Sequence, residues 1–154
     1  MGYVTVLAVH SLFRWVVVVA LLARVGRALQ ARKGAFTPID KRLGLIAMIA
    51  MDLQLLLGLA LFFGLSPAVS AAEMDVGAAM KDPYLRFWLV EHGPTMLIAI
   101  VLAHVGNVRV RKAADDAAKH KQALIFFGIA LVLVLVAMPW PFRPVVGRPL
   151  LPGF

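Results

Sequence analysis

Four long apolar runs divide this chain, and each is long enough to cross the hydrocarbon core of a membrane. A helix needs about 20 predominantly apolar residues for such a crossing. The runs are Val4–Ala23, Leu43–Leu65, Phe87–Gly106 and Gln122–Met138. Open strands cannot cross lipid, and the runs lack the alternation of barrel strands, so we expect four helices. The sequence therefore predicts an all-α membrane protein, a single four-transmembrane-helix bundle over residues 1–154.

The composition supports this membrane location. Hydrophobic residues make up 62% of the 154 residues and charged residues only 16%, against about 45–50% and about 25% in soluble domains. Cysteine is absent, which excludes disulfides, thiolate metal sites and a catalytic thiol. The net charge of +8 collects between the apolar runs, so it indicates membrane orientation and not a surface for nucleic acid.

The connections between the runs predict the topology. Cationic residues dominate residues 24–42 and 107–121, whereas acids outnumber cations in residues 66–86. The positive-inside rule places the two cationic connections in the cytoplasm. We therefore expect both termini on the non-cytoplasmic side, most naturally of a bacterial cytoplasmic (inner) membrane. A short surface helix is expected near Ala71–Met80. The apolar, proline-rich tail 139–154 is expected to lie over the bundle mouth or on a partner.

Ionisable side chains inside the spans are the candidate functional residues, because a charge there costs about 2.5–3.5 kcal/mol on insertion. At a rise of about 1.5 Å per residue, His10 lies roughly 9 Å below the outer end of the first run. Glu91 and His92 lie roughly 7–8 Å below the outer end of the third run. Arg14 and Asp52 both come out near the midplane, so we predict that they pair. His10 and Arg14 share one helix face.

The third run carries further features around His92. Pro94 removes a backbone donor, which predicts a kink beside Gly93 and more space next to His92. Trp88 and Met96 share a helix face with His92.

Two further histidines lie toward the inner side. His104 is a candidate for a helix–helix hydrogen bond or for ligation. His120, between Lys119 and Lys121, is expected to be solvated or to face lipid headgroups.

The outer histidines point to haem b, because imidazole is a suitable iron ligand. Haem b in a membrane bundle is usually held by histidines from two helices, with arginines near its propionates. His10 and His92 are the predicted ligands. Glu91 points about 100° away from His92, so it is assigned to orienting a ligand or to Arg14. The arginines predicted at the outer rim are Arg86, Arg143 and Arg148.

Two alternatives stay open at this point. The first is a purely structural polar network of His10, Arg14, Asp52, Glu91 and His92. The second is metal or proton handling, in which Met96 makes copper an option and His104 and His120 are secondary metal candidates.

Four segments also carry a resemblance. HSLFRW in the first run, YLRFWLVEHG entering the third, KHK before the fourth and PWP with GRP in the tail resemble small four-helix bacterial membrane proteins catalogued loosely as cytochrome b-like. The resemblance covers most of the chain. It implies a haem-binding or respiratory accessory role that His10 and His92 would perform.

These observations give two ranked functional expectations. The first is a haem-b electron-transfer protein that exchanges electrons with quinone or a respiratory partner. The alternative is a non-catalytic accessory subunit or assembly factor of a membrane complex, or a small metal- or proton-handling protein. No nucleophile motif and no phosphate-binding loop is present, so an electron carrier or a subunit is expected before a catalyst.

Overall fold

The computed structural model describes residues 2–65 and 76–152. Within these residues, four helices are long and apolar enough to cross a membrane, namely Gly2–Gln30, Pro38–Gly64, Pro83–Lys112 and Asp116–Ala137. The all-helical, four-span architecture predicted from the apolar runs is thus confirmed, and it indicates an integral membrane protein. Each helix continues past its apolar run into the polar connection.

Polar caps explain these longer helices. The Asp82 carboxylate accepts hydrogen bonds from the backbone N–H groups of Tyr84 and Leu85, at 2.7 and 3.0 Å, and starts α5 (Pro83–Arg86). The Asp115 carboxylate accepts from Ala118 N–H at 2.7 Å and starts α7 (Asp116–Ala137). A capping carboxylate satisfies donors that the first helical turn leaves free.

The second span begins with a similar arrangement. The Asp40 carboxylate accepts from both the backbone N–H and the hydroxyl of Thr37, at 2.8 and 2.6 Å, at the start of α2 (Pro38–Leu59). Asp40 also accepts from Arg27 Nε at 3.0 Å, which ties this cap to α1 (Gly2–Gln30).

Two spans contain a π-helical turn. α2 continues into η1 (Ala60–Leu65), and α5 continues through η2 (Phe87–His92) into α6 (Gly93–Lys112). The π-helical turn η2 ends at His92, directly before Gly93, where the sequence predicted a kink. Such turns widen the helix locally and occur frequently at functional sites.

The expected surface helix near Ala71–Met80 is described only in part. Residues 71–75 lie outside the described residues, and the short helix α4 (Val76–Ala79) occupies the remainder.

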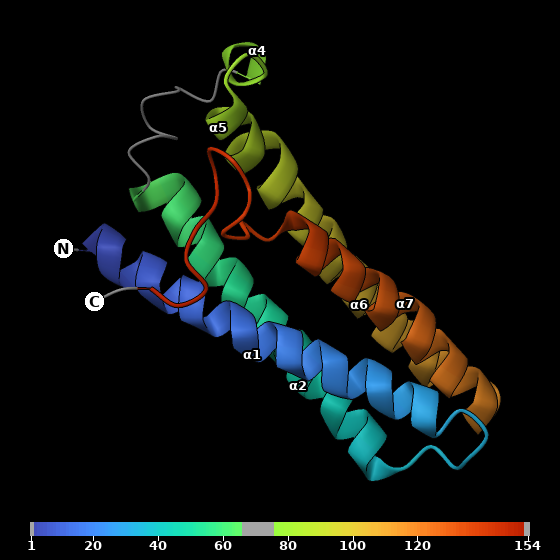
Figure 1. The fold of residues 1–154 in the computed structure, drawn as a ribbon. Coiled ribbons are helices and arrows are strands. Elements are labelled where there is room, and N and C mark those ends of the chain that lie inside the picture. The colour runs from blue at the N-terminus through green and yellow to red at the C-terminus, as the bar shows by residue number, and fades with distance from the viewer. Residues whose placement is uncertain (1, 66–75, 153–154) are drawn as a thin grey trace.

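The four spans pack as two close pairs, α1 with α2 and α6 with α7, and α1 also packs along α7 (Figure 1). Both termini lie at one end of the bundle (Figure 1). Small residues line the seams, as expected where close backbone approach and not hydrophobic burial joins helices in lipid. The buried alanines of the spans are Ala20, Ala28, Ala47, Ala50, Ala99, Ala103, Ala123, Ala130 and Ala137.

The proline-rich tail folds back over the bundle from the end of α7 to α1 (Figure 1). Trp15 Nε1 donates to the carbonyl of Leu150 at 2.9 Å, and Trp140 Nε1 donates to Leu135 at 2.7 Å. A Cβ on Gly147 would lie 2.6 Å from the carbonyl oxygen of Arg143, so this turn of the tail requires glycine. The tail is thus an ordered element that covers one end of the bundle.

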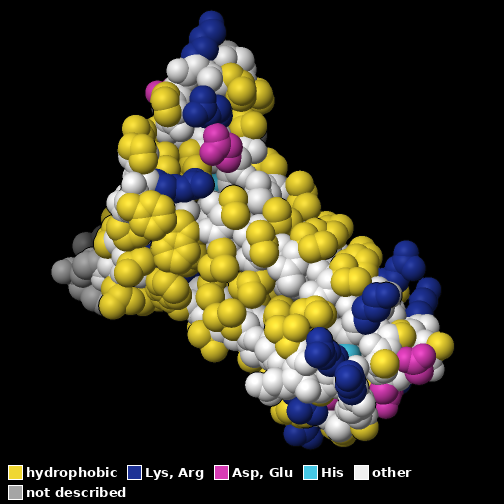
Figure 2. Space-filling model, turned by 45° about the vertical axis from the view of Figure 1, so that its right-hand side comes forward, with side chains coloured by type: hydrophobic (Ala, Val, Ile, Leu, Met, Phe, Trp, Pro, Cys, Tyr) yellow, Lys and Arg dark blue, Asp and Glu magenta, His cyan; other side chains and the backbone are white. Residues whose placement is uncertain are grey.

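Side chains on the outside follow the pattern of a membrane protein. Hydrophobic side chains cover the flank of the bundle, and Lys and Arg side chains gather at the end opposite the tail (Figure 2). We call that end, which contains the connections 31–37 and 113–115, the basic end, and the end covered by residues 139–152 the tail end.

Candidate functional site

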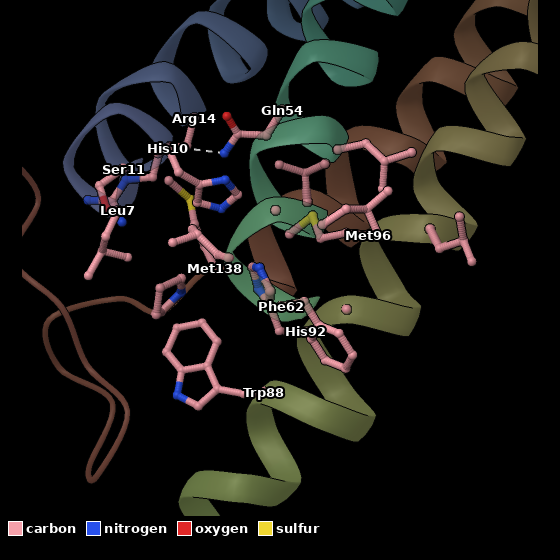
Figure 3. A pocket seen from close by; sticks show the side chains of 18 of the residues that line it. Leu7, His10, Ser11, Arg14, Gln54, Phe62, Trp88, His92, Met96 and Met138 are labelled. Carbon is pink, nitrogen blue, oxygen red and sulfur yellow. Dashed lines mark hydrogen bonds between the residues drawn. The ribbon is translucent and has the colours of Figure 1, made fainter. Parts of the chain in front are cut away.

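A cavity of about 380 Å³ opens among the spans at the tail end. His10 projects into it from α1 and His92 from the π-helical turn η2 (Figure 3). Their ring centroids lie 6.4 Å apart, with the ring planes inclined by 68°. The structure therefore brings together, in one cavity, the two histidines that the sequence singled out.

The two imidazoles differ in their hydrogen bonds. His92 Nδ1 lies 2.8 Å from the carbonyl oxygen of Ala137. Because a carbonyl can only accept, Nδ1 carries the proton and the lone pair of His92 is left on Nε2. His10 Nδ1 is buried without a hydrogen-bond partner in the described residues. Both rings thus retain a nitrogen that no structural hydrogen bond uses.

Neighbouring residues in α2 fix the position of His10. Gln54 Nε2 donates to the backbone carbonyl of His10 at 3.0 Å (Figure 3). A Cβ on Gly58 would lie 3.4 Å from His10 Cε1, so the backbone of α2 at Gly58 lies close beside the ring. Neither Gln54 nor Gly58 was predicted, because only the rotation of α2 about its axis turns them toward α1.

The rest of the wall is mostly aromatic and apolar, but it includes unpaired donors. Trp88 Nε1 and Arg148 Nε are buried without a partner in the described residues, and the Arg148 guanidinium lies 5.1 Å from the Trp88 ring centroid. Phe62, Met96 and other apolar side chains complete the lining. A ligand here would meet an apolar wall with cationic and N–H donors on one side.

Arg14 also lines this cavity, but its partner differs from the predicted one. Its guanidinium donates to the carbonyls of Pro149 and Leu150, both at 2.7 Å. Asp52 Oδ1 instead accepts a hydrogen bond from His104 Nε2 at 2.8 Å across the α2–α6 seam. The predicted Arg14–Asp52 pair is therefore wrong, because the tail supplies carbonyl acceptors to Arg14. His104 makes one of the two contacts considered for it, a helix–helix hydrogen bond.

Glu91 and Arg86 lie outside the cavity and contact each other. Arg86 Nε and Glu91 Oε1 are 3.0 Å apart, and both side chains are exposed. The prediction that Glu91 orients a ligating histidine or pairs with Arg14 is wrong. The Ala137 carbonyl orients His92 in its place, because the π-helical turn directs Glu91 outward and His92 inward.

The single polar network considered for five residues is not formed, because three of them have other partners. The five residues are His10, Arg14, Asp52, Glu91 and His92. Asp52 bonds to His104, Glu91 pairs with Arg86, and Arg14 bonds to the tail. Only the two histidines remain facing each other in the cavity.

A second group of buried polar residues lies at the basic end, where the sequence predicted exposure. His120 is fully buried against Phe36, with ring centroids 5.1 Å apart. Arg24 is 1% exposed, and its guanidinium lies 5.5 Å from the ring centroids of Phe36 and Phe127. The expectation of a solvated His120 is wrong, because its side chain is fully buried against Phe36 in the α1–α2 connection.

The described residues contain no group of three or more His, Cys, Asp or Glu side chains that could hold a metal ion.

The chain matches no protein-family model, no curated protein and no solved structure among those with which it was compared.

Proposed function

We propose that this chain is a haem-b-binding electron-transfer protein of a bacterial cytoplasmic membrane, with both termini outside. The observation that carries the proposal is the pair His10 and His92, which face each other across a cavity between different helices. Quinone or a respiratory partner would exchange electrons with it.

The spacing of the two rings supports a shared metal between them. The ring centroids lie 6.4 Å apart, and a metal held by both rings would form a bond of about 2 Å to one nitrogen of each. A bare metal ion would need a third or fourth protein ligand, whereas haem provides four nitrogens of its own. The lack of a three-residue ligand group in the described residues therefore favours haem.

The surrounding residues fit this cofactor. Bound haem would supply a one-electron iron couple. The Ala137 carbonyl fixes the tautomer and orientation of His92, so that Nε2 is the nitrogen that could hold the iron. Arg148 has an unpaired buried Nε at the cavity wall, and its N–H groups would donate to a propionate carboxylate. Trp88 and Phe62 would pack on the macrocycle and exclude water.

The test is the absorption spectrum of purified protein expressed with ample haem. We expect a Soret band that is lost or strongly shifted in His10→Ala and in His92→Ala. His104→Ala is the matched control, since His104 bonds to Asp52 outside this cavity, and it should keep the wild-type spectrum. In His92→Gly, added imidazole should restore the spectrum. Wild-type protein without Soret absorbance would contradict the proposal, and control of the spectrum by His104 or His120 would move the cofactor to another layer.

A second candidate is an accessory subunit of a membrane complex, and one observation favours it. Asp52 and His104 form a pair within the spans whose side chains are 45% and 49% exposed. Ionisable side chains in a span normally face protein or water and not lipid, so another transmembrane helix would cover this pair.

A photoreactive residue at Val101, which is exposed on α6, should then crosslink to a second protein. The same residue at Val132, exposed on α7, should not. Equal crosslinking from both positions would contradict a specific partner.

A further inference from the structure

The basic end contains a second cavity, of about 420 Å³, whose lining is mostly cationic. It lies between the turn that follows α1 and the first turns of α7, and its lining residues are Arg32, Lys33, Ala117, His120, Lys121 and Leu124. The four α7 residues recur at three- and four-residue spacing, so they share one helix face.

No acid offsets these charges within the cavity. The two nearest carboxylates along α7 have other partners. Asp115 caps α7 through Ala118 N–H. Asp116 pairs with Lys119 at 2.7 Å and accepts from the backbone N–H of Phe36 at 3.0 Å. Arg32, Lys33 and Lys121 therefore present their positive charge to whatever enters the cavity.

His120 is an independent sign that this cavity takes a ligand. Its side chain is fully buried, and neither ring nitrogen has a hydrogen-bond partner in the part of the chain that the structure describes. A buried N–H without a partner destabilises the fold, and an acceptor group in the cavity would remove that cost.

We propose that this cavity binds the phosphate group of an anionic ligand at the level of the lipid headgroups. Arg32 would hold the phosphate oxygens with its two-donor guanidinium edge, the lysines would add charge, and the His120 N–H would donate from the base of the cavity. Leu124 gives the side nearer the membrane core an apolar wall, which suits the first carbons of a lipid chain. Basic pockets between transmembrane helices bind anionic lipid headgroups in this way. The phosphate could belong to a lipid or be a free ion, and neither source depends on the haem proposal.

The first experiment titrates detergent-solubilised protein with phosphatidylglycerol or phosphatidylcholine and counts bound lipid by native mass spectrometry. We expect one phosphatidylglycerol to bind at least about tenfold more tightly than phosphatidylcholine. Each cation near an anionic headgroup contributes about fivefold, so the triple variant Arg32→Gln, Lys33→Gln, Lys121→Gln should weaken binding about a hundredfold. The matched control, Lys41→Gln, Arg42→Gln, Lys112→Gln, loses the same charge from exposed positions outside the cavity. It should bind like the wild type, and an equal loss in both triple variants would overturn the proposal.

The second experiment identifies the source of the phosphate and the role of His120. The ring signals of ¹⁵N-histidine-labelled protein are followed by NMR, with His120→Phe used for assignment. Phosphatidylglycerol should move the His120 signals and leave those of His10 unchanged. If inorganic phosphate alone produces the same movement and displaces the lipid, the site takes free phosphate. If neither probe moves the His120 signals, the proposed site is wrong even if lipid adheres elsewhere.

Discussion

At the scale of single residues, Arg14 and Asp52, two charged side chains expected at the same depth in the spans, have different partners. Arg14 is 8% exposed and donates to two carbonyls of the tail, whereas Asp52 accepts a hydrogen bond from His104. An isolated charge in this environment would cost several kcal/mol, so partners are required. Depth alone does not determine which ones are used.

Double-mutant cycles test these pairings. For alanine variants of Asp52 and His104, we expect a coupling free energy of about 0.5–2 kcal/mol, the usual size for interhelical hydrogen bonds in membranes. For Arg14 and Asp52 we expect a coupling near zero, because Arg14 bonds to Pro149 and Leu150. Both cycles can be measured by unfolding in mixed detergent micelles. A larger coupling for Arg14 with Asp52 than for Asp52 with His104 would contradict the partners described here.

At these positions the sequence predicts the depth of a side chain in the membrane but not its partner. The layer that holds His10 and His92 could be predicted, because the rise per residue is constant and helix ends are marked by charge. The partner of Arg14 could not be predicted from the sequence, since its acceptors are backbone carbonyls more than 130 residues away. The burial of His120 could not be predicted either, because it depends on where the α1–α2 connection places Phe36.

At the scale of elements, the apolar runs were sufficient to place the four helices, and their polar caps extend them. What the runs could not predict is the rotation of each helix about its axis. Asp52 faces α6 and Gln54 faces His10, although both belong to the same apolar run. The pattern around α2 gives little indication of which face is buried, because lipid covers much of the helix and leaves its outer face as apolar as its inner one.

Gly106 tests the close packing of α6 against α7. A Cβ at this position would lie 2.3 Å from Phe126 Cβ, a distance that only a shift of the helices can relieve. Gly106→Ala should therefore lower the free energy of unfolding by about 1–3 kcal/mol, the usual cost of overpacking. The matched control is Gly128→Ala in α7, where a Cβ meets nothing within 4 Å. It should leave stability unchanged or raise it by up to about 1 kcal/mol. A similar loss in both variants would mean that helix packing at Gly106 is not the cause.

At the scale of the whole molecule, the two ends of the bundle have opposite character. The tail end holds an apolar cavity with two facing histidines, covered by an ordered proline-rich segment. The basic end holds the cationic connections and the cavity that His120 lines. Two spans separate the two cationic connections, so both lie on one side of the membrane, and in the orientation proposed from the positive-inside rule that side faces the cytoplasm. The redox site proposed for His10 and His92 then lies in the outer half of the membrane.

This orientation can be tested with thiol labelling, because the chain has no cysteine and an introduced cysteine is its only thiol. Gly34→Cys and Ala114→Cys place it at exposed positions of the basic end, and Lys81→Cys places it at an exposed position between the second and third spans. Gly34 tolerates a side chain, since the nearest atom to its added Cβ is 3.6 Å away. A membrane-impermeant maleimide added to intact cells should label only Lys81→Cys. After permeabilisation it should label all three variants, which controls for thiol reactivity. Labelling of Gly34→Cys and Ala114→Cys in intact cells, with Lys81→Cys protected, would reverse the orientation and place the histidine cavity in the cytoplasmic half of the membrane.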